Sequence, residues 1–82
     1  MARRVDQRAD VTRDSRGCLR TIAWRGNVHS VKEELDAWEE AGSWWEGERA
    51  RRFHLVTTHT NLQCELCFEP QTNLWTLCRV WD

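Results

Sequence analysis

Two cysteines in the carboxy-terminal half of the chain have the spacing of a metal or redox motif. Cys64 and Cys67 form a C-x-x-C pair. With Cys18, Cys78 or a histidine, this pair would complete a tetrahedral zinc site, and without metal it would be a redox dithiol. The alternation of polar and apolar residues around the motif instead predicts a strand, which places Cys64 and Cys67 on opposite faces. We therefore expect packed thiols with no metal or cofactor, and zinc binding through Cys64 and Cys67 is the alternative.

The histidines and carboxylates do not form a recognisable catalytic set. His29, His54 and His59 have no cysteine or carboxylate at catalytic spacing, and a Cys67–His54 nucleophile pair would have to meet across a hairpin. The carboxylates crowd into residues 32–48, where they are typical of a solvated helix face. The four glycines are isolated, so the sequence has no phosphate-binding glycine loop. The sequence predicts that the protein is not an enzyme and has no small-molecule substrate.

Tryptophan and arginine provide the strongest candidate for a contact surface. The 82 residues include six tryptophans, and the Trp44-Trp45 pair shortly precedes Arg51 and Arg52. Tryptophan and arginine are typical anchors of protein interfaces, and the same mixture binds single-stranded nucleic acid by stacking and phosphate neutralisation. A third interpretation is that one tryptophan closes the core beneath arginine side chains. We predict a protein partner, with single-stranded nucleic acid as the alternative, and the predicted contact residues are Trp44, Trp45, Arg51 and Arg52.

The charge distribution is uneven although the total nearly cancels. Twelve basic and thirteen acidic residues give a net charge of −1. Residues 1–31 carry seven arginines against three aspartates, whereas residues 32–48 carry one lysine against seven carboxylates. No apolar run approaches the roughly 20 residues of a membrane helix, and no apolar stretch of a secretory signal follows the first arginines. We expect a cytoplasmic protein with reduced cysteines and no membrane partner.

The amino-terminal segment predicts an arm followed by the first strand. Residues 1–16 are almost entirely charged or polar and predict a disordered basic arm, because such a composition cannot offset the entropy of ordering. Residues 17–82 are then a single domain. Residues 18–25 are rich in β-branched and aromatic side chains and predict a strand.

A helix is expected next. Ser30 and Glu33 have the spacing of a capping box, in which each side chain bonds the backbone N–H of the other residue. Val31, Leu35 and Trp38 follow at helical spacing. These features predict a helix over residues 31–41.

The remaining residues predict an antiparallel meander. Strands are expected at residues 49–59, 62–69 and 74–81, with turns at residues 60–61 and 70–73. The sum is a small α+β domain in the order β-α-β-β-β, in which one helix covers one face of the antiparallel sheet.

The order of the aromatic residues resembles that of a small bacterial domain of unknown function. The resemblance covers about residues 24–82, and that family occurs as short stand-alone proteins. It is also similar to the tail of ImuB-type proteins, the catalytically inactive Y-family polymerase homologues of a bacterial mutagenesis cassette. The residues that carry the resemblance are Trp38, the Trp44-Trp45 pair, Phe53 after an arginine-rich strand start, Trp75 after a turn, and the closing Val80-Trp81-Asp82.

The resemblance has consequences for function but none for catalysis. Asn73 stands where the family usually has a turn glycine, and Trp81 where it commonly has tyrosine. Asparagine adopts the same left-handed turn geometry, so the first departure leaves the fold intact. The resemblance implies no catalytic residue. It implies a non-catalytic adaptor that binds a protein partner of the DNA-damage-tolerance (translesion synthesis) polymerase machinery.

Overall fold

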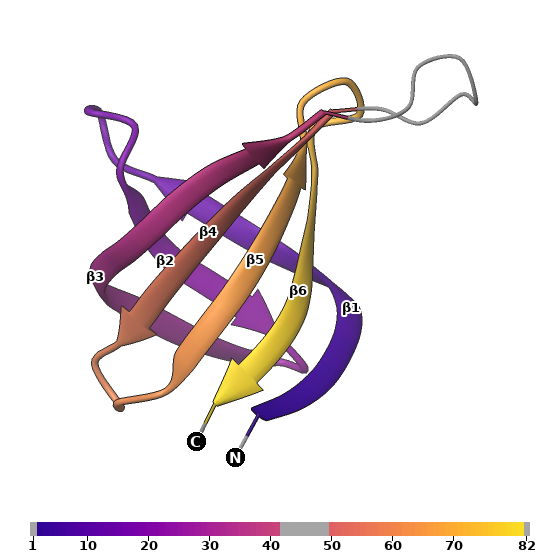
Figure 1. Ribbon diagram of the computed structural model, residues 1–82. Helices are drawn as coiled ribbons and strands as arrows, with labels where there is room; N and C mark the ends of the chain where they lie inside the picture. The colour runs from indigo at the N-terminus through magenta and orange to yellow at the C-terminus, as the bar shows by residue number, and fades with distance from the viewer. Residues whose placement is uncertain (1, 42–49, 82) are drawn as a thin grey trace.

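Six antiparallel strands form a closed barrel in which each strand pairs with its neighbour in sequence and β6 returns to β1 (Figure 1). The computed structural model describes residues 2–41 and 50–81. These residues contain no helix, and hence none that could cross a membrane, so the predicted α+β fold with a covering helix is wrong. The strands are β1 (Ala2–Arg13), β2 (Leu19–Trp24), β3 (Asn27–Glu40), β4 (Arg51–Thr58), β5 (Gln63–Glu69) and β6 (Leu74–Trp81).

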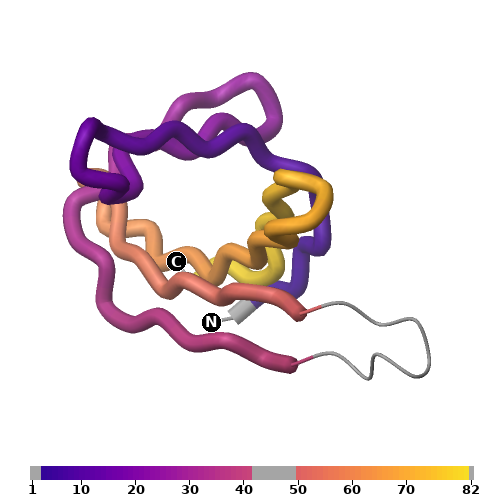
Figure 2. The backbone as a smooth tube through the Cα atoms, turned by 90° about the horizontal axis from the view of Figure 1, so that it is seen from above, coloured from indigo at the N-terminus to yellow at the C-terminus, as the bar shows by residue number. Residues whose placement is uncertain are grey.

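The two longest strands, β1 and β3, join two sheets into a single barrel. The larger sheet contains β4, β5 and β6 together with residues 2–9 of β1 and residues 31–40 of β3. The smaller sheet contains β2 together with residues 10–13 of β1 and residues 27–30 of β3. Figure 2 shows the resulting ring from above. Because β1 and β3 take part in both sheets, the six strands can close on themselves.

Residues with positive φ lie in four of the hairpin connections, and Gly17 (φ 83°) lies in the one between β1 and β2. Arg25 (φ 53°) and Gly26 (φ 76°) form the connection between β2 and β3, a two-residue turn that needs positive φ at both positions. Asn61 (φ 65°) and Asn73 (φ 57°) lie in the turns before β5 and β6. The turns predicted at residues 60–61 and 70–73 are therefore confirmed.

The inner faces of the strands form one apolar core. Val56, Leu66, Leu77 and Val80 are at most 1% exposed, and Ile22 from the smaller sheet packs with them. Burying an aliphatic side chain of this size stabilises the fold by about 1.5–3 kcal/mol. This core supports the side chains that both sheets present outward.

The strands predicted for the carboxy-terminal half are confirmed. β4, β5 and β6 lie within the ranges 49–59, 62–69 and 74–81. Residues 18–25, the first predicted strand, contain β2. In each of these segments successive side chains point alternately to the inside and the outside of the barrel.

The predicted helix over residues 31–41 is wrong because this segment belongs to β3. Its pairing with β4 shifts register between Val31 and Glu33 and again between Glu34 and Asp36. Each β-bulge adds one residue, so the apolar side chains leave the two-residue period and imitate helical spacing. Leu35 lies at the second shift and is 45% exposed, whereas the helix prediction placed it against the sheet. Pairing with β4 thus outweighs local helix propensity.

Residues 1–16, expected as a disordered arm, contain β1. Residues 2–9 pair with β6 and residues 10–13 pair with β2. Ala9 is 4% exposed in the core, and Val5 and Val11 pack against it. The few apolar residues of this charged segment therefore face inward, and the barrel begins before residue 17.

Candidate functional site

The outer face of the larger sheet carries a stacked aromatic pair. Trp38 of β3 and Phe53 of β4 are opposite in register, with ring centroids 5.5 Å apart and an interplanar angle of 8°. Cys67 of β5 is opposite Phe53, and its thiol contacts that of Cys78 on β6. We name Trp38, Phe53, Cys67 and Cys78 the outer patch. Both rings are only half-buried, so part of this apolar surface is open to solvent.

Charged side chains surround the outer patch. Arg51 Nε is 4.0 Å from Glu69 Oε1, and Arg79 Nε is 3.9 Å from Glu65 Oε2. Arg51, Arg79 and Glu65 border, with the outer patch, a hollow of about 270 Å³. Partly exposed ion pairs of this kind each contribute at most about 1 kcal/mol to stability. An apolar floor within a charged rim has the anatomy of a protein interface.

Burial raises the pKa of three thiols, one in the core and two in the outer patch. Burial raises the pKa of Cys64 to about 11. Burial raises the pKa of Cys78 to about 12, and the neighbouring Cys67 adds to the shift. Burial also raises the pKa of Cys67, although the charge of Arg51 partly opposes this. Because the thiolate is the reactive form, these cysteines are weak nucleophiles and weak metal ligands.

The C-x-x-C motif is divided between two faces of β5. Cys64 belongs to the core, whereas Cys67 borders the outer hollow. The predicted opposite orientation of the two thiols is confirmed, and they cannot ligate one ion. Among residues 2–41 and 50–81, no three histidine, cysteine, aspartate or glutamate side chains lie close enough to hold a metal ion.

The four predicted contact residues do not all lie on one surface. Arg51 borders the outer hollow. Arg52, the next residue of β4, points to the opposite face of the strand, where its Nε lies 2.8 Å from Glu39 Oε1. Trp44 and Trp45 lie outside the described residues. The structure therefore brings Arg51 to the outer hollow, whereas Arg52 borders a second hollow of about 190 Å³ that Trp38 and Phe53 also line.

His54 lies on the inner side of β4, away from Cys67. Its Nδ1 is 2.9 Å from Glu34 Oε1, and its ring is 5.3 Å from that of Trp75. Its Nε2 is buried without a hydrogen-bond partner within the described part of the chain. The Cys67–His54 nucleophile pair considered from the sequence is therefore not assembled.

Comparison with known families identifies the domain. A family model described as a domain of unknown function (DUF6504) matches residues 2–82. The chain belongs to the DUF6504 family. The match includes β1 and so extends beyond the residues that carry the sequence resemblance. No curated protein and no solved structure matches the chain. The comparisons show no link between this DUF6504 member and ImuB-type proteins.

Sequence reasoning missed the Trp38–Phe53 pair that this DUF6504 domain presents. The two-residue period of a strand places Phe53 and Leu55 on the same face of β4. The sequence does not reveal that Trp38 is the partner of Phe53, because the helical spacing of Val31, Leu35 and Trp38 predicts a helix there. Only the register of β3 against β4 brings the two rings together.

Proposed function

We propose that this domain is a non-catalytic protein-interaction module and that the outer patch is its contact surface. The observation that carries the proposal is the stacked Trp38–Phe53 pair, half-buried on the outside of a closed barrel. Central aromatic side chains within a rim of charge are the usual hot spots of protein interfaces. The cytoplasm is the proposed location.

The outer patch is already ordered before a partner arrives. Trp38 and Phe53 stack on each other and stand on paired strands, so binding need not order them again. Avoiding this entropy loss, about 0.5–1.5 kcal/mol for each immobilised side chain, favours tight association. The rim offers both signs of charge, which suits a protein surface better than a polyanion.

The predicted contact residues beyond the outer patch remain part of the proposal. Trp44 and Trp45 lie in sequence between the strands that carry Trp38 and Phe53. Arg51 borders the hollow, and Arg52 extends the contact toward the opposite face of β4. A partner that binds at this end of β3 and β4 would contact Arg51 and Arg52.

We further propose that the protein partner belongs to the DNA-damage-tolerance machinery, as a component of a translesion polymerase assembly. The support is the resemblance of the aromatic pattern to the tail of ImuB-type proteins. Co-purification of tagged domain with such a polymerase after DNA damage tests this step. Recovery of partners unrelated to DNA repair would refute the finer assignment and leave the binding surface standing.

The outer patch is tested by comparing matched variants of the purified domain. The Trp38→Ala/Phe53→Ala double variant should lose a partner that wild type retains. The control is Leu35→Ala, because this β3 side chain is apolar and 45% exposed but lies outside the outer patch. With the purified partner, the double variant should bind at least about 30-fold more weakly, the effect of losing a hot spot of about 2 kcal/mol. Equal binding by the double variant and the control, with both variants folded, would refute the proposal.

Single-stranded nucleic acid and zinc are weaker candidates for this surface. Arg51 and Arg52 point to opposite faces and lie beside Glu69 and Glu39, so they do not form a continuous phosphate-binding track. Cys64 and Cys67 are on opposite faces of β5, which removes the ligand pair on which the zinc alternative depends.

A further inference from the structure

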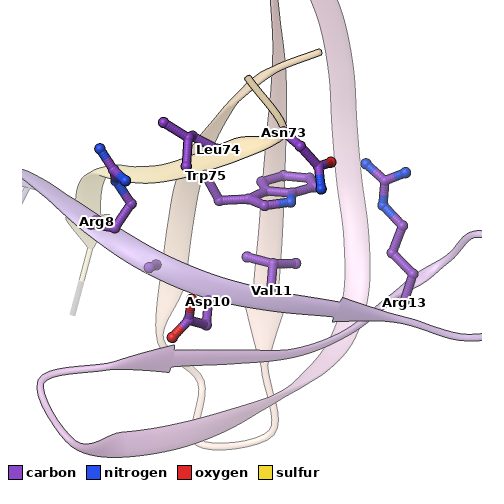
Figure 3. Close-up of a pocket in the computed structure, with 8 residues that line it drawn as sticks. Arg8, Asp10, Val11, Arg13, Asn73, Leu74 and Trp75 are labelled. Carbon is purple, nitrogen blue, oxygen red and sulfur yellow. The ribbon is translucent and has the colours of Figure 1, made fainter. Parts of the chain in front are cut away.

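β1 and β6 separate at one end of the barrel and leave a pocket between them. Ala9 pairs with Trp75, but from Asp10 onward β1 pairs with β2 instead. The gap holds a pocket of about 360 Å³, which we name the seam pocket (Figure 3). This volume falls within the range of small-molecule sites, about 300–1,000 Å³.

Arg13 forms one end of the seam pocket. Its guanidinium carbon is 5.0 Å from the ring centroid of Phe68 and 5.1 Å from that of Trp75. These contacts place the guanidinium beside two aromatic rings, and a contact of this kind is worth about 0.5–1 kcal/mol at an exposed site. The side chain is exposed and lines the pocket, so part of the guanidinium is available to a ligand. Guanidinium planes are stacking surfaces for nucleobases.

Arg8 forms the other end. It is exposed, lines the pocket, and makes no ion pair with a carboxylate of residues 2–41 or 50–81. In Figure 3, Arg8 and Arg13 stand on either side of Trp75, and the side chain of Asp10 points away from the indole. Two arginines against one aspartate make the lining attractive to an anion.

The separation of the two arginines defines the shape of the ligand. Five residues of strand place their Cα atoms at most about 16 Å apart, with a register shift before Arg13, and this separation favours two contact points over one shared phosphate. The arrangement suits a ligand with a planar group at one end and an anionic group at the other. Val11 and Leu74 supply apolar walls between the two ends.

We propose that the seam pocket binds a nucleoside phosphate. The base stacks on the open face of Arg13, and the phosphate pairs with Arg8. The ligand is either a free nucleotide or one unit of a single-stranded nucleic acid, because both present the same base and phosphate. This site is separate from the outer patch, so it stands or falls independently of the proposed protein partner.

The test uses the full chain and a fluorescein-labelled oligothymidylate of about ten nucleotides, a length within the usual range of single-strand sites. Anisotropy is followed at about 50 mM and about 200 mM salt, because phosphate contacts make affinity salt-dependent. Arg13→Gln should weaken binding at least about tenfold, the loss expected for one stacked base. Arg8→Gln should weaken binding by about three- to tenfold and lower the salt slope by about one. Arg13→Lys keeps the charge and should behave like Arg13→Gln, because the planar stack is lost.

The control is Arg20→Gln, which removes the same charge from an exposed residue of β2 outside the seam pocket. It should change affinity less than about twofold, as expected for a charge at a distance. Displacement of the oligonucleotide by thymidine monophosphate would assign the site to free nucleotides. Binding of the oligonucleotide without such displacement would assign it to a strand.

Three results would overturn the proposal. The first is the absence of binding by both probes at the lower salt. The second is equal weakening by Arg20→Gln and Arg13→Gln, which would show general attraction to a polyanion. The third is displacement of the oligonucleotide by a glutamate-rich peptide, which would show a carboxylate site. Circular dichroism of each variant separates these results from a loss of fold.

Discussion

The outer patch and the seam pocket use the same residue types in different electrostatic settings. At the outer patch, the aromatic rings stack on each other, and Arg51 and Arg79 lie near Glu69 and Glu65. At the seam pocket, the aromatic ring faces a guanidinium, and Arg8 has no carboxylate partner in the described structure. The first surface offers apolar area within balanced charge, and the second offers an excess of positive charge beside an aromatic ring. Whether carboxylates lie near an arginine therefore indicates the kind of partner that the surface binds. The arginine alone does not indicate it.

The two regions also depend on different parts of the fold. The outer patch needs the register of β3, β4, β5 and β6 within the larger sheet. The seam pocket needs the point at which β1 leaves β6 for β2. A substitution in one region should therefore leave binding at the other region unchanged, unless the substitution also damages the shared core.

The largest expected effect comes from the core beneath both regions. Leu66→Ala removes a side chain that is fully buried and should lower the free energy of unfolding by about 2–5 kcal/mol. Urea denaturation measures this change, and binding at both regions should fall with the folded population. Leu35→Ala, at an exposed position, should stay within about 0.5 kcal/mol of wild type. Similar stabilities for the two variants would contradict the closed core.

The next effect separates the two regions. Trp38→Ala should weaken binding of the purified protein partner at least about 30-fold, while the loss of the ring stack lowers stability by no more than about 1.5 kcal/mol. Arg13→Gln should leave that protein interaction unchanged, and Trp38→Ala should leave oligonucleotide binding unchanged. Titrations of both variants with both partners measure this separation. Loss of both interactions in one folded variant would show that the two regions are one surface.

Alkaline pH should act on the core and the outer patch before the seam pocket. The pKa of Cys64 rises from 9.0 to about 11 and that of Cys78 to about 12, mainly by burial. The unfolded thiols lose their protons first, so above about pH 9 the unfolded state binds fewer protons and stability falls as pH rises. Below about pH 9 the buried thiols make their full contribution to the free energy of unfolding. This contribution is lost as the pH rises through the folded-state pKa values of Cys64 and Cys78. Urea midpoints in wild type and Cys64→Ala measure the slope.

The control for this pH dependence is thiol reactivity. Cys18 is exposed and should be alkylated first at neutral pH, whereas Cys64, Cys67 and Cys78 should react slowly until the pH rises. Intact-mass spectrometry counts the modified thiols. An equal alkaline slope in wild type and Cys64→Ala, or equal labelling of all four cysteines at neutral pH, would contradict the assigned burial.

The smallest expected effect concerns the charged rim of the outer patch. Arg79→Gln removes a partner 3.9 Å from Glu65 and should change stability by less than about 1 kcal/mol. Its effect on the protein partner should appear mainly in the association rate and weaken at high salt. Stopped-flow measurements test this. If Arg79→Gln lost as much affinity for the protein partner as Trp38→Ala, the charged rim and not the aromatic pair would be the centre of the interface.

The carboxy-terminal strands could be predicted from sequence because their alternation is uninterrupted. In β5, Cys64, Leu66 and Phe68 point inward, and the intervening residues point outward. In β3 the two bulges break this period, and the acidic helix formers then dominate the local pattern. No local rule reveals a register that depends on β4.

The closure of the barrel could not be predicted because it joins the ends of the chain. β1 pairs with β6, and its register shift between Arg4 and Gln7 hides the inward alternation of its few apolar residues. The charged composition of this segment indicates disorder when taken alone. Trp38 with Phe53, and Arg13 with Trp75, become neighbours only after these distant pairings form.

Site-specific photo-crosslinking at the rim of the outer patch tests the central claim most directly. A benzophenone side chain would replace Arg51, which borders the patch, or Val28, which is 68% exposed near the opposite end of β3. With the purified protein partner, we predict a crosslink from position 51 that Trp38→Ala abolishes, and none from position 28. Equal crosslinking from both positions, or a crosslink at position 51 that survives Trp38→Ala in a folded variant, would contradict the assignment of the outer patch as the contact surface.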